Sequence, residues 1–198
     1  WALYESDKDA AYHSVHDIDM DKLDLQVACP YSPDNVKPLD DVAGVELGGA
    51  LKNVIALAAG MCDGLDLGAN AKAALLTRGV LEMSTLGIAL GARPETFYGL
   101  SGIGDLITTS LSAEGRNRAV GEALGRGRTL KQILGATDKV TEGVWTSKAV
   151  VAFARARKVP VPIAREVYRV CFEGRPARAA LATLMGRSVG PEGAVPGR

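Results

Sequence analysis

The sequence predicts a mainly α-helical fold, a multi-helix bundle preceded by a short irregular or α/β N-terminal appendage. From residue 44 onward the chain is rich in Ala and Leu, and its apolar residues recur at spacings of three and four. Residues 1–40 instead contain many Asp and few periodic apolar positions. No alternation of strands with helices, which a parallel α/β fold needs, is apparent. We therefore expect an appendage at 1–40, a helical domain at 41–187 and a flexible tail at 188–198.

In the appendage, apolar and polar residues alternate over 23–27, which predicts a short strand, and a turn is expected at 32–35. The helical domain has eight predicted helices, at 45–63, 70–90, 101–111, 114–125, 129–135, 142–157, 162–173 and 176–186. Their borders carry the expected signals, with N-caps at Asn70 and Thr141, first-turn prolines at Pro162 and Pro176, and C-terminal glycines at Gly91, Gly125 and Gly174.

The charge and cysteine content exclude several classes of protein. Lys+Arg 23 against Asp+Glu 23 gives zero net charge, which argues against a nucleic-acid or acidic-membrane binder. Cys29, Cys62 and Cys171 are odd in number and widely spaced, so we expect buried thiols in a reducing cytoplasm rather than disulfides or a zinc site. The most apolar stretch, 54–59, is far shorter than the roughly 20 residues that span a bilayer, so no membrane insertion is expected.

The dinucleotide-binding fingerprint is absent from the sequence. Gly99, Gly102 and Gly104 have the spacing G-x-x-G-x-G, and the residues before them do not predict a strand. His13 and His16 lie three residues apart, but no further His or Cys accompanies them, so surface histidines are the expected interpretation. The basic run 155–158 is interpreted as a helix C-terminus and is assigned no ligand.

Lys52 is the first candidate for chemistry. It lies in an apolar helix rich in small residues, where Gly48, Gly49 and Ala50 would let a ligand approach closely. Apolar surroundings disfavour an ammonium group, so such a lysine can act as a general base. The alternative is a solvated lysine on the polar face of an amphipathic helix.

Two further candidates lie at predicted helix starts. Asp105 follows a glycine-rich turn and either belongs to a ligand site or only caps its helix. Arg116, Asn117 and Arg118 follow Gly115, and two guanidinium groups beside a helix N-terminus suit a phosphate. The alternative for this pair of arginines is a solvated surface.

Five segments occur in one order: 44–56, 68–75, 99–109, 116–118 and 141–143. Together they resemble the C-terminal, substrate-binding domain of bacterial NAD(P)-dependent glycerol-3-phosphate dehydrogenase. The resemblance implies an all-helical domain like the C-terminal domain of 6-phosphogluconate dehydrogenase. It also implies glycerol 3-phosphate or dihydroxyacetone phosphate as substrate, NAD or NADP as cofactor, and a nucleotide bound by a separate Rossmann domain.

The resemblance also implies residue roles. The lysine at the Lys52 position is the proton acceptor for the substrate hydroxyl, and the substrate-binding positions are Lys52, Asp105, Gly115, Arg116 and Asn117. The positions near the nucleotide are Arg116, Val140 and Glu142. Gly115 departs from the family, whose bacterial members commonly have Ser there, so the phosphate contact of that hydroxyl is lost.

Because the fingerprint is absent, we expect the chain to hold no nucleotide stably and to be inactive alone. The alternatives are a chimeric or fragment helical domain without turnover and an oligomerisation module, in which apolar surface is buried between copies as a homo-oligomer.

The appendage resembles a different family. Residues 10–40, and most clearly 16–38, resemble a segment of the large subunit of the aconitase-like 3-isopropylmalate dehydratases. No residue matches the iron–sulfur cysteines of that family, so Cys29 is not assigned as a cluster ligand. The change of resemblance near 41–44 leads to the hypothesis that the chain is a chimera.

Overall fold

The computed structural model describes residues 26–28, 36–136 and 141–186, with side chains from Gly44 onward. The chain divides into two compact units, 1–38 and 39–198. In the first unit, β1 (Gln26–Ala28) pairs antiparallel with β2 (Val36–Pro38), and Val27 lies opposite Lys37. β1 overlaps the end of the predicted strand at 23–27, whereas β2 was not predicted. The expected turn at 32–35, the tail, His13, His16 and Cys29 all lie outside the described residues.

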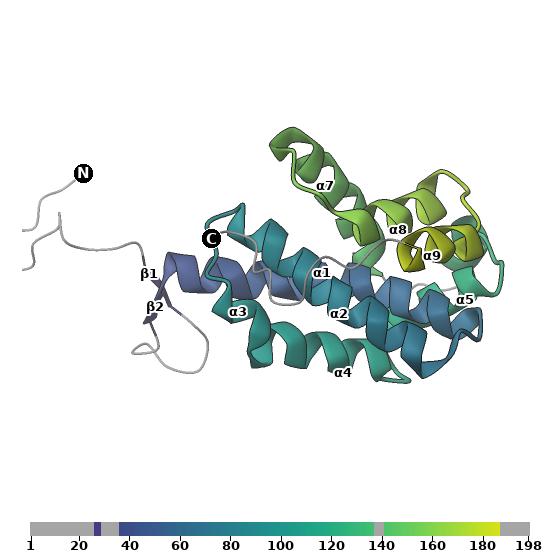
Figure 1. Ribbon diagram of the computed structural model, residues 1–198, viewed down its shortest axis with the longest axis horizontal. Helices are drawn as coiled ribbons and strands as arrows, with labels where there is room; N and C mark the ends of the chain where they lie inside the picture. The colour runs from purple at the N-terminus through teal and green to yellow at the C-terminus, as the bar shows by residue number, and fades with distance from the viewer. Residues whose placement is uncertain (1–25, 29–35, 137–140, 187–198) are drawn as a thin grey trace, which may run out of the picture. The chain divides into compact units, whose positions relative to one another are not determined.

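The second unit is helical, which confirms the predicted fold class (Figure 1). Its elements are α1 (Leu39–Gly64), α2 (Gly68–Ile88), α3 (Glu95–Tyr98), the π-helical segment η2 (Leu100–Gly104), α4 (Asp105–Leu111), α5 (Arg116–Gly125), α6 (Leu130–Leu134), α7 (Glu142–Arg157), α8 (Pro162–Phe172) and α9 (Ala177–Met185). Two differences from the sequence expectation matter. α3 was not predicted, and the helix expected at 101–111 is divided into η2 and α4.

The helix borders show which local signals were interpreted correctly. The prediction of Asn70 as an N-cap is wrong, because α2 begins at Gly68 and Asn70 lies inside it. Thr141 does precede α7, although its side chain makes no capping hydrogen bond, and Pro162 is in the first turn of α8. Pro176 is the residue before α9 rather than in its first turn.

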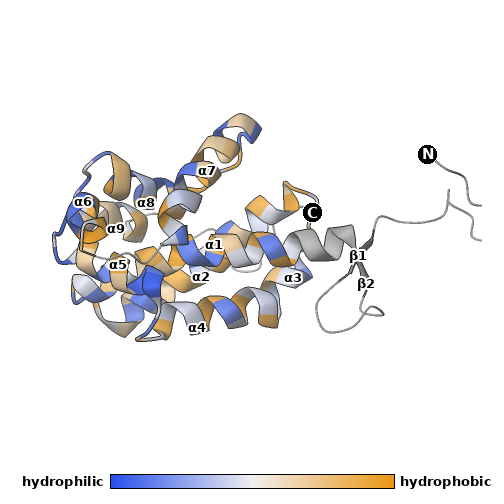
Figure 2. Cartoon of the chain, turned by 180° about the vertical axis from the view of Figure 1, so that it is seen from behind, coloured by the Kyte–Doolittle hydropathy of each residue, from blue (hydrophilic) through white to orange (hydrophobic). Residues whose placement is uncertain are grey.

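α1 is the central helix of the second unit. It contacts α2, α4, α5, α7 and α8, which lie around it in Figure 1. Among its side chains, Leu57 is fully buried and Val54 and Met61 are 1% exposed. Figure 2 shows hydrophobic and hydrophilic residues interleaved along the surrounding helices, as expected where each helix buries one face. By length and composition Gly44–Gly64 is apolar enough to cross a membrane, but 67% of the tested window is buried, which is typical of a core helix.

Glycines bring α1 and α5 into backbone contact. A Cβ added at Gly60 would lie 2.0 Å from the Arg118 carbonyl oxygen, and one added at Gly121 would lie 2.0 Å from that of Leu57. Real Cβ atoms essentially never approach closer than 3.0 Å, so only glycine fits at these positions. This close approach sets the first two turns of α5 directly beside the C-terminal half of α1.

A buried carboxylate fixes the start of α8. Glu82 on α2 is 8% exposed and accepts hydrogen bonds from the backbone N–H groups of Ile163 at 2.7 Å and Ala164 at 2.9 Å. The first N–H groups of a helix have no acceptor within the helix itself, so the Glu82 carboxylate supplies one. Its negative charge also interacts favourably with the helix dipole. Glu82 thereby ties α2 to α8.

Candidate functional site

Lys52 of α1 and Asp105, the first residue of α4, form an ion pair. The Lys52 side chain is 21% exposed and the Asp105 side chain 38% exposed. The pair therefore lies at the surface, with Lys52 the more covered of the two. The second carboxylate oxygen of Asp105 accepts a hydrogen bond from the Thr109 hydroxyl at 3.3 Å, one helical turn away. The expectation of an apolar setting for Lys52 is therefore wrong in one respect: a carboxylate holds its amine.

The turn before Asp105 is held by Phe97 of α3. This ring is fully buried, and a Cβ added at Gly102 would lie 2.2 Å from the Phe97 carbonyl oxygen. The glycine therefore allows η2 to pass close to α3 and directs the chain into α4. The packing of η2 against α3 therefore fixes the backbone position of Asp105, in addition to the ion pair with Lys52.

Asn53 and Asn117 connect three helices beside this pair. The Asn117 amide donates to the Asn53 side-chain oxygen at 3.0 Å, and the Asn117 oxygen accepts from the backbone N–H of Gly143 at 3.0 Å. The Asn53 amide donates to the Gly49 carbonyl at 3.1 Å and to the Glu142 carboxylate at 3.2 Å. Both Asn side chains are 8% exposed. Buried amides with these partners fix the first turns of α5 and α7 against α1.

Arg116 and Glu142 form the exposed edge of the same region. One guanidinium nitrogen of Arg116 lies 4.0 Å from a Glu142 carboxylate oxygen, and the two side chains are 55% and 61% exposed. An exposed pair at this distance contributes little to stability. The guanidinium therefore remains accessible to a ligand from solvent.

Arg118 does not join Arg116 in a phosphate cluster. Its guanidinium donates to Asp63 at 3.2 Å, to Glu122 at 3.0 Å and to the Ser112 carbonyl at 3.0 Å. It therefore links α1, α5 and the loop before α5. The prediction that two guanidinium groups serve one phosphate is therefore wrong for Arg118, and the phosphate contact of Arg116 stays a prediction.

A shallow groove of about 480 Å³ runs along this region. Its lining includes residues from α1, η2, α4 and α7, among them Gly49, Ala50, Asn53, Ser101, Asp105 and Glu142. Gly49 has no atom within 4 Å of the place where a Cβ would be, so the groove wall is open there. Of the three small residues expected to let a ligand approach, Gly49 and Ala50 line the groove, whereas a Cβ at Gly48 would lie 3.3 Å from the Ser101 carbonyl oxygen.

The remaining predicted site residues fall in two places. Gly115 is the residue before α5, and a Cβ there would lie 3.0 Å from the Thr109 carbonyl oxygen, so its hydrogen allows a tight loop. Val140 lies outside the described residues. The structure adds Asn53 and Thr109, which sequence reasoning did not assign. The spacing of four between Asp105 and Thr109 on a helix was the available signal for the second.

The part of the chain with described side chains contains no group of three His, Cys, Asp or Glu residues that could hold a metal ion. Cys62 and Cys171 are free, buried thiols. Burial raises the pKa of Cys62 to about 11, with a further increase from Asp63 and an opposing effect of Lys72. Burial alone raises the pKa of Cys171 to about 12. These protonated thiols are not candidates for nucleophilic chemistry.

Known proteins resemble this chain over the region that carries the site. The family described as the C-terminus of NAD-dependent glycerol-3-phosphate dehydrogenase matches residues 41–182. Glycerol-3-phosphate dehydrogenase [NAD(P)+] of Paracidovorax citrulli is 55% identical over 153 residues, which is 77% of this chain and 45% of that protein. The Listeria monocytogenes protein of the same name is 52% identical over 148 residues, 75% of this chain and 44% of its own.

Solved structures agree with this likeness. The crystal structure of glycerol-3-phosphate dehydrogenase from Coxiella burnetii has a TM-score of 0.73 at 40% identity, and the match covers 76% of this chain and 46% of that one. The structure of the Saccharomyces cerevisiae enzyme has a TM-score of 0.67 at 31% identity, covering 74% and 43%.

The chain spans about 45% of the length of the curated relatives it matches. The family match starts at residue 41, so it gives no support to the dehydratase resemblance of residues 10–40. Over most of its length, the chain belongs to the family of C-terminal domains of NAD-dependent glycerol-3-phosphate dehydrogenase.

Proposed function

We propose that this domain supplies the substrate-binding and proton-transfer half of an NAD(P)-dependent glycerol-3-phosphate dehydrogenase. The observation that carries the proposal is the Lys52–Asp105 ion pair, whose carboxylate lines the groove. Lys52, Asp105 and Asn117 come from three helices; the Lys52–Asp105 bond joins α1 to α4, and the Asn117–Asn53 bond joins α5 to α1. Such a preorganised polar set beside an open groove is what a small polar substrate requires.

The chemistry assigned to Lys52 is proton transfer at the C2 oxygen of glycerol 3-phosphate. Once its ammonium has released a proton, Lys52 accepts the C2 hydroxyl proton as the neutral amine, and in the reverse direction its ammonium returns that proton to the oxygen of dihydroxyacetone phosphate. Asp105 accepts a hydrogen bond from the lysine and so fixes the position of Nζ. A nicotinamide cofactor, when bound, supplies the hydride transfer.

Arg116 and the start of α5 would bind the substrate phosphate. A guanidinium presents several N–H groups to a phosphate, and the first N–H groups of α5 add partial positive charge. Asn117 is already occupied by Asn53 and Gly143, so its contribution is to position this turn. Gly115 offers no hydroxyl, so we expect the guanidinium to carry more of the phosphate contact.

We also propose that the groove receives one face of a nicotinamide nucleotide, NAD or NADP. The open space at Gly49 leaves room for a flat ring along α1, and Arg116 and Glu142 offer exposed polar groups at the edge. The described residues provide no dinucleotide fingerprint. We therefore propose that turnover requires a nucleotide-binding domain, and that the chain by itself is inactive. The buried free thiols Cys62 and Cys171 support a reducing cytoplasm as its location.

Calorimetric titration of the chain with dihydroxyacetone phosphate tests the binding half of the proposal. Lys52→Ala and Arg116→Gln should each weaken binding about tenfold or more, because each removes a charged partner. Lys131→Ala is the matched control, since Lys131 is an exposed lysine on α6. Equal affinity in Lys52→Ala and the control would contradict the proposed role of Lys52.

Turnover is followed by the absorbance of NADH in the presence of dihydroxyacetone phosphate. We expect none from the chain alone, and turnover when residues 41–187 are joined to the remainder of the Paracidovorax citrulli relative. Lys52→Ala in that fusion should abolish the reaction. Activity that persists in Lys52→Ala would exclude this lysine as the proton acceptor.

Self-association is a second candidate function, favoured by exposed apolar side chains on η2 and α4. Leu100 is 92% exposed and Leu111 is 57% exposed. Burying such side chains between two copies is favourable. Light scattering should then give a dimer or larger species that Leu100→Glu with Leu111→Glu reduces to a monomer; a monomeric parent chain would exclude this function.

A further inference from the structure

Positive charge is concentrated near the C-terminal end of the helical unit, although the whole chain has zero net charge. Between residues 155 and 178 the only acidic residues are Glu166 and Glu173. The basic residues of the same segment are Arg155, Arg157, Lys158, Arg165, Arg169, Arg175 and Arg178. Such segregation creates a local positive potential that the composition as a whole does not reveal.

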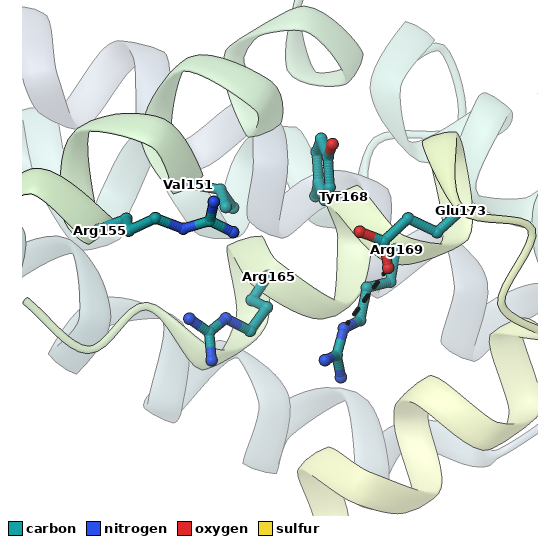
Figure 3. A pocket seen from close by; sticks show the side chains of 6 residues that line it. All are labelled: Val151, Arg155, Arg165, Tyr168, Arg169 and Glu173. Carbon is teal, nitrogen blue, oxygen red and sulfur yellow. Dashed lines mark ion pairs between the residues drawn. The ribbon is translucent and has the colours of Figure 1, made fainter.

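Part of this charge surrounds a groove between α7 and α8. A depression of about 210 Å³ is lined by Val151, Arg155, Arg165, Tyr168, Arg169 and Glu173. Figure 3 shows Val151 and Arg155 extending from α7 and the other labelled side chains from α8 and its C-terminal end. An adjoining depression of about 290 Å³ shares Arg155 and Arg165 and adds Lys158, the residue after α7. None of these residues lines the candidate substrate groove.

The arginines of this groove differ in their partners. Arg169 is neutralised by Glu166 at 3.0 Å and Glu173 at 3.8 Å, the second of which is the dashed pair in Figure 3. Arg155 and Arg165 form no ion pair with any carboxylate whose position the structure describes. Two guanidinium groups that have no counter-ion among the described residues therefore line the same two adjoining depressions.

The basic run 155–158 thus has more than the role of a helix C-terminus. Arg157 lies over the Phe153 ring, with 5.1 Å between its guanidinium carbon and the ring centroid. Its neighbours Arg155 and Lys158 line the depressions instead. The run divides into a side chain that packs on the protein and two that are available to a ligand.

We propose that this groove binds a small oligophosphate anion of the pyrophosphate or tripolyphosphate class. Arg binds phosphate oxygens in bidentate geometry. Arg155 and Arg165 line both depressions, so one ligand can place a phosphate group in each depression and contact both guanidinium groups. Lys158 adds a third cation at the second depression, and the Tyr168 hydroxyl offers a neutral donor at the first. The site is separate from the groove at Asp105.

Titration of the full chain with sodium tripolyphosphate at low salt, followed by calorimetry, tests the proposal. We expect saturable binding that weakens about a hundredfold or more in the double variant Arg155→Gln with Arg165→Gln, because each lost charged hydrogen-bonding group costs at least about a factor of ten. The double variant Lys131→Gln with Arg178→Gln removes the same charge from exposed positions that line neither depression and should bind like the parent chain. Thermal melts check that all variants fold.

Two comparisons make the result decisive. Arg116→Gln should leave tripolyphosphate binding intact, because Arg116 belongs to the candidate substrate site; a loss there with no effect of Arg155→Gln and Arg165→Gln would overturn the proposal. Orthophosphate should bind much more weakly than tripolyphosphate, since a single phosphate group cannot occupy both depressions. Equal affinity for the two anions, or no saturable binding by the parent chain, would equally overturn it.

Discussion

Replacement of Gly60 by alanine tests the backbone contact between α1 and α5. The new Cβ would lie 2.0 Å from the Arg118 carbonyl oxygen, 2.8 Å from the Glu122 nitrogen and 2.9 Å from the Arg118 carbonyl carbon. All three are backbone atoms, so no side chain can rotate away. Because real Cβ atoms essentially never approach closer than 3.0 Å, the two helices must separate by about 1 Å at this point.

The expected cost follows from this separation. Overpacking of a core typically costs about 1–3 kcal/mol, and a gap of about 1 Å forfeits up to half of the dispersion energy of the neighbouring contacts. Alanine returns about 1 kcal/mol through its helix propensity. We expect Gly60→Ala to lower the free energy of unfolding by about 2 kcal/mol net, because the whole α1–α5 interface is affected. In a domain of this size that corresponds to a Tm about 4–8 °C lower.

Gly49→Ala is the matched control on the same helix. It has no atom within 4 Å of the added Cβ, so only the helix-propensity term applies. We expect this variant to be about 0.5–1 kcal/mol more stable than the parent chain. Urea denaturation followed by circular dichroism measures both variants. If Gly60→Ala were as stable as Gly49→Ala, the inferred contact between the two backbones would be refuted.

Three further predictions concern buried or paired side chains. Glu82→Ala should lower the free energy of unfolding in urea by about 2–4 kcal/mol, because it leaves two backbone donors of α8 without their acceptor; stability equal to the parent would contradict the cap. Arg118→Met should lower the free energy of unfolding by about 1–2 kcal/mol at low salt and by less at high salt, since Arg118 pairs with two partly exposed carboxylates. A decrease that does not depend on salt would indicate that only packing is lost. In a Cys29→Ser background, Cys62 and Cys171 should react with iodoacetamide at pH 8 at most about one hundredth as fast as in urea, because the raised pKa values keep both thiols protonated at pH 8 and burial limits access. Rapid labelling of the folded chain, measured by mass spectrometry, would contradict the burial of these thiols.

The long helices were predictable because their apolar residues repeat at three and four positions over many turns. α7 and α8 illustrate this, since their predicted and observed ranges agree to within a residue. α3 has four residues and η2 has five, which is too short for a repeat to be visible. Asn70 failed as a cap because capping preference is a weak local signal, and α2 begins two residues earlier at Gly68.

The candidate site was predictable only as separate pieces. Lys52 and Asp105 are 53 positions apart, so nothing in their local sequence shows that they form a pair, and only the resemblance placed them in one site. Arg118 looks identical to Arg116 in the sequence, yet the fold turns it to Asp63. Gly60 and Gly64 repeat at a spacing of four on α1, as Gly121 and Gly125 do on α5, and this spacing is a sequence signal for a close helix pair.

The central position of α1 bears on the exchange of its backbone amide hydrogens with solvent. Because α1 touches α2, α3, η2, α4, α5, α7, α8 and α9, few local openings can expose its middle turns without disrupting the helical unit as a whole. Lys52 and Asn53 lie on those turns. Their amides should exchange only when almost the whole domain opens. The fraction of molecules in which the backbone at Lys52 is displaced is therefore set by the stability of the entire domain.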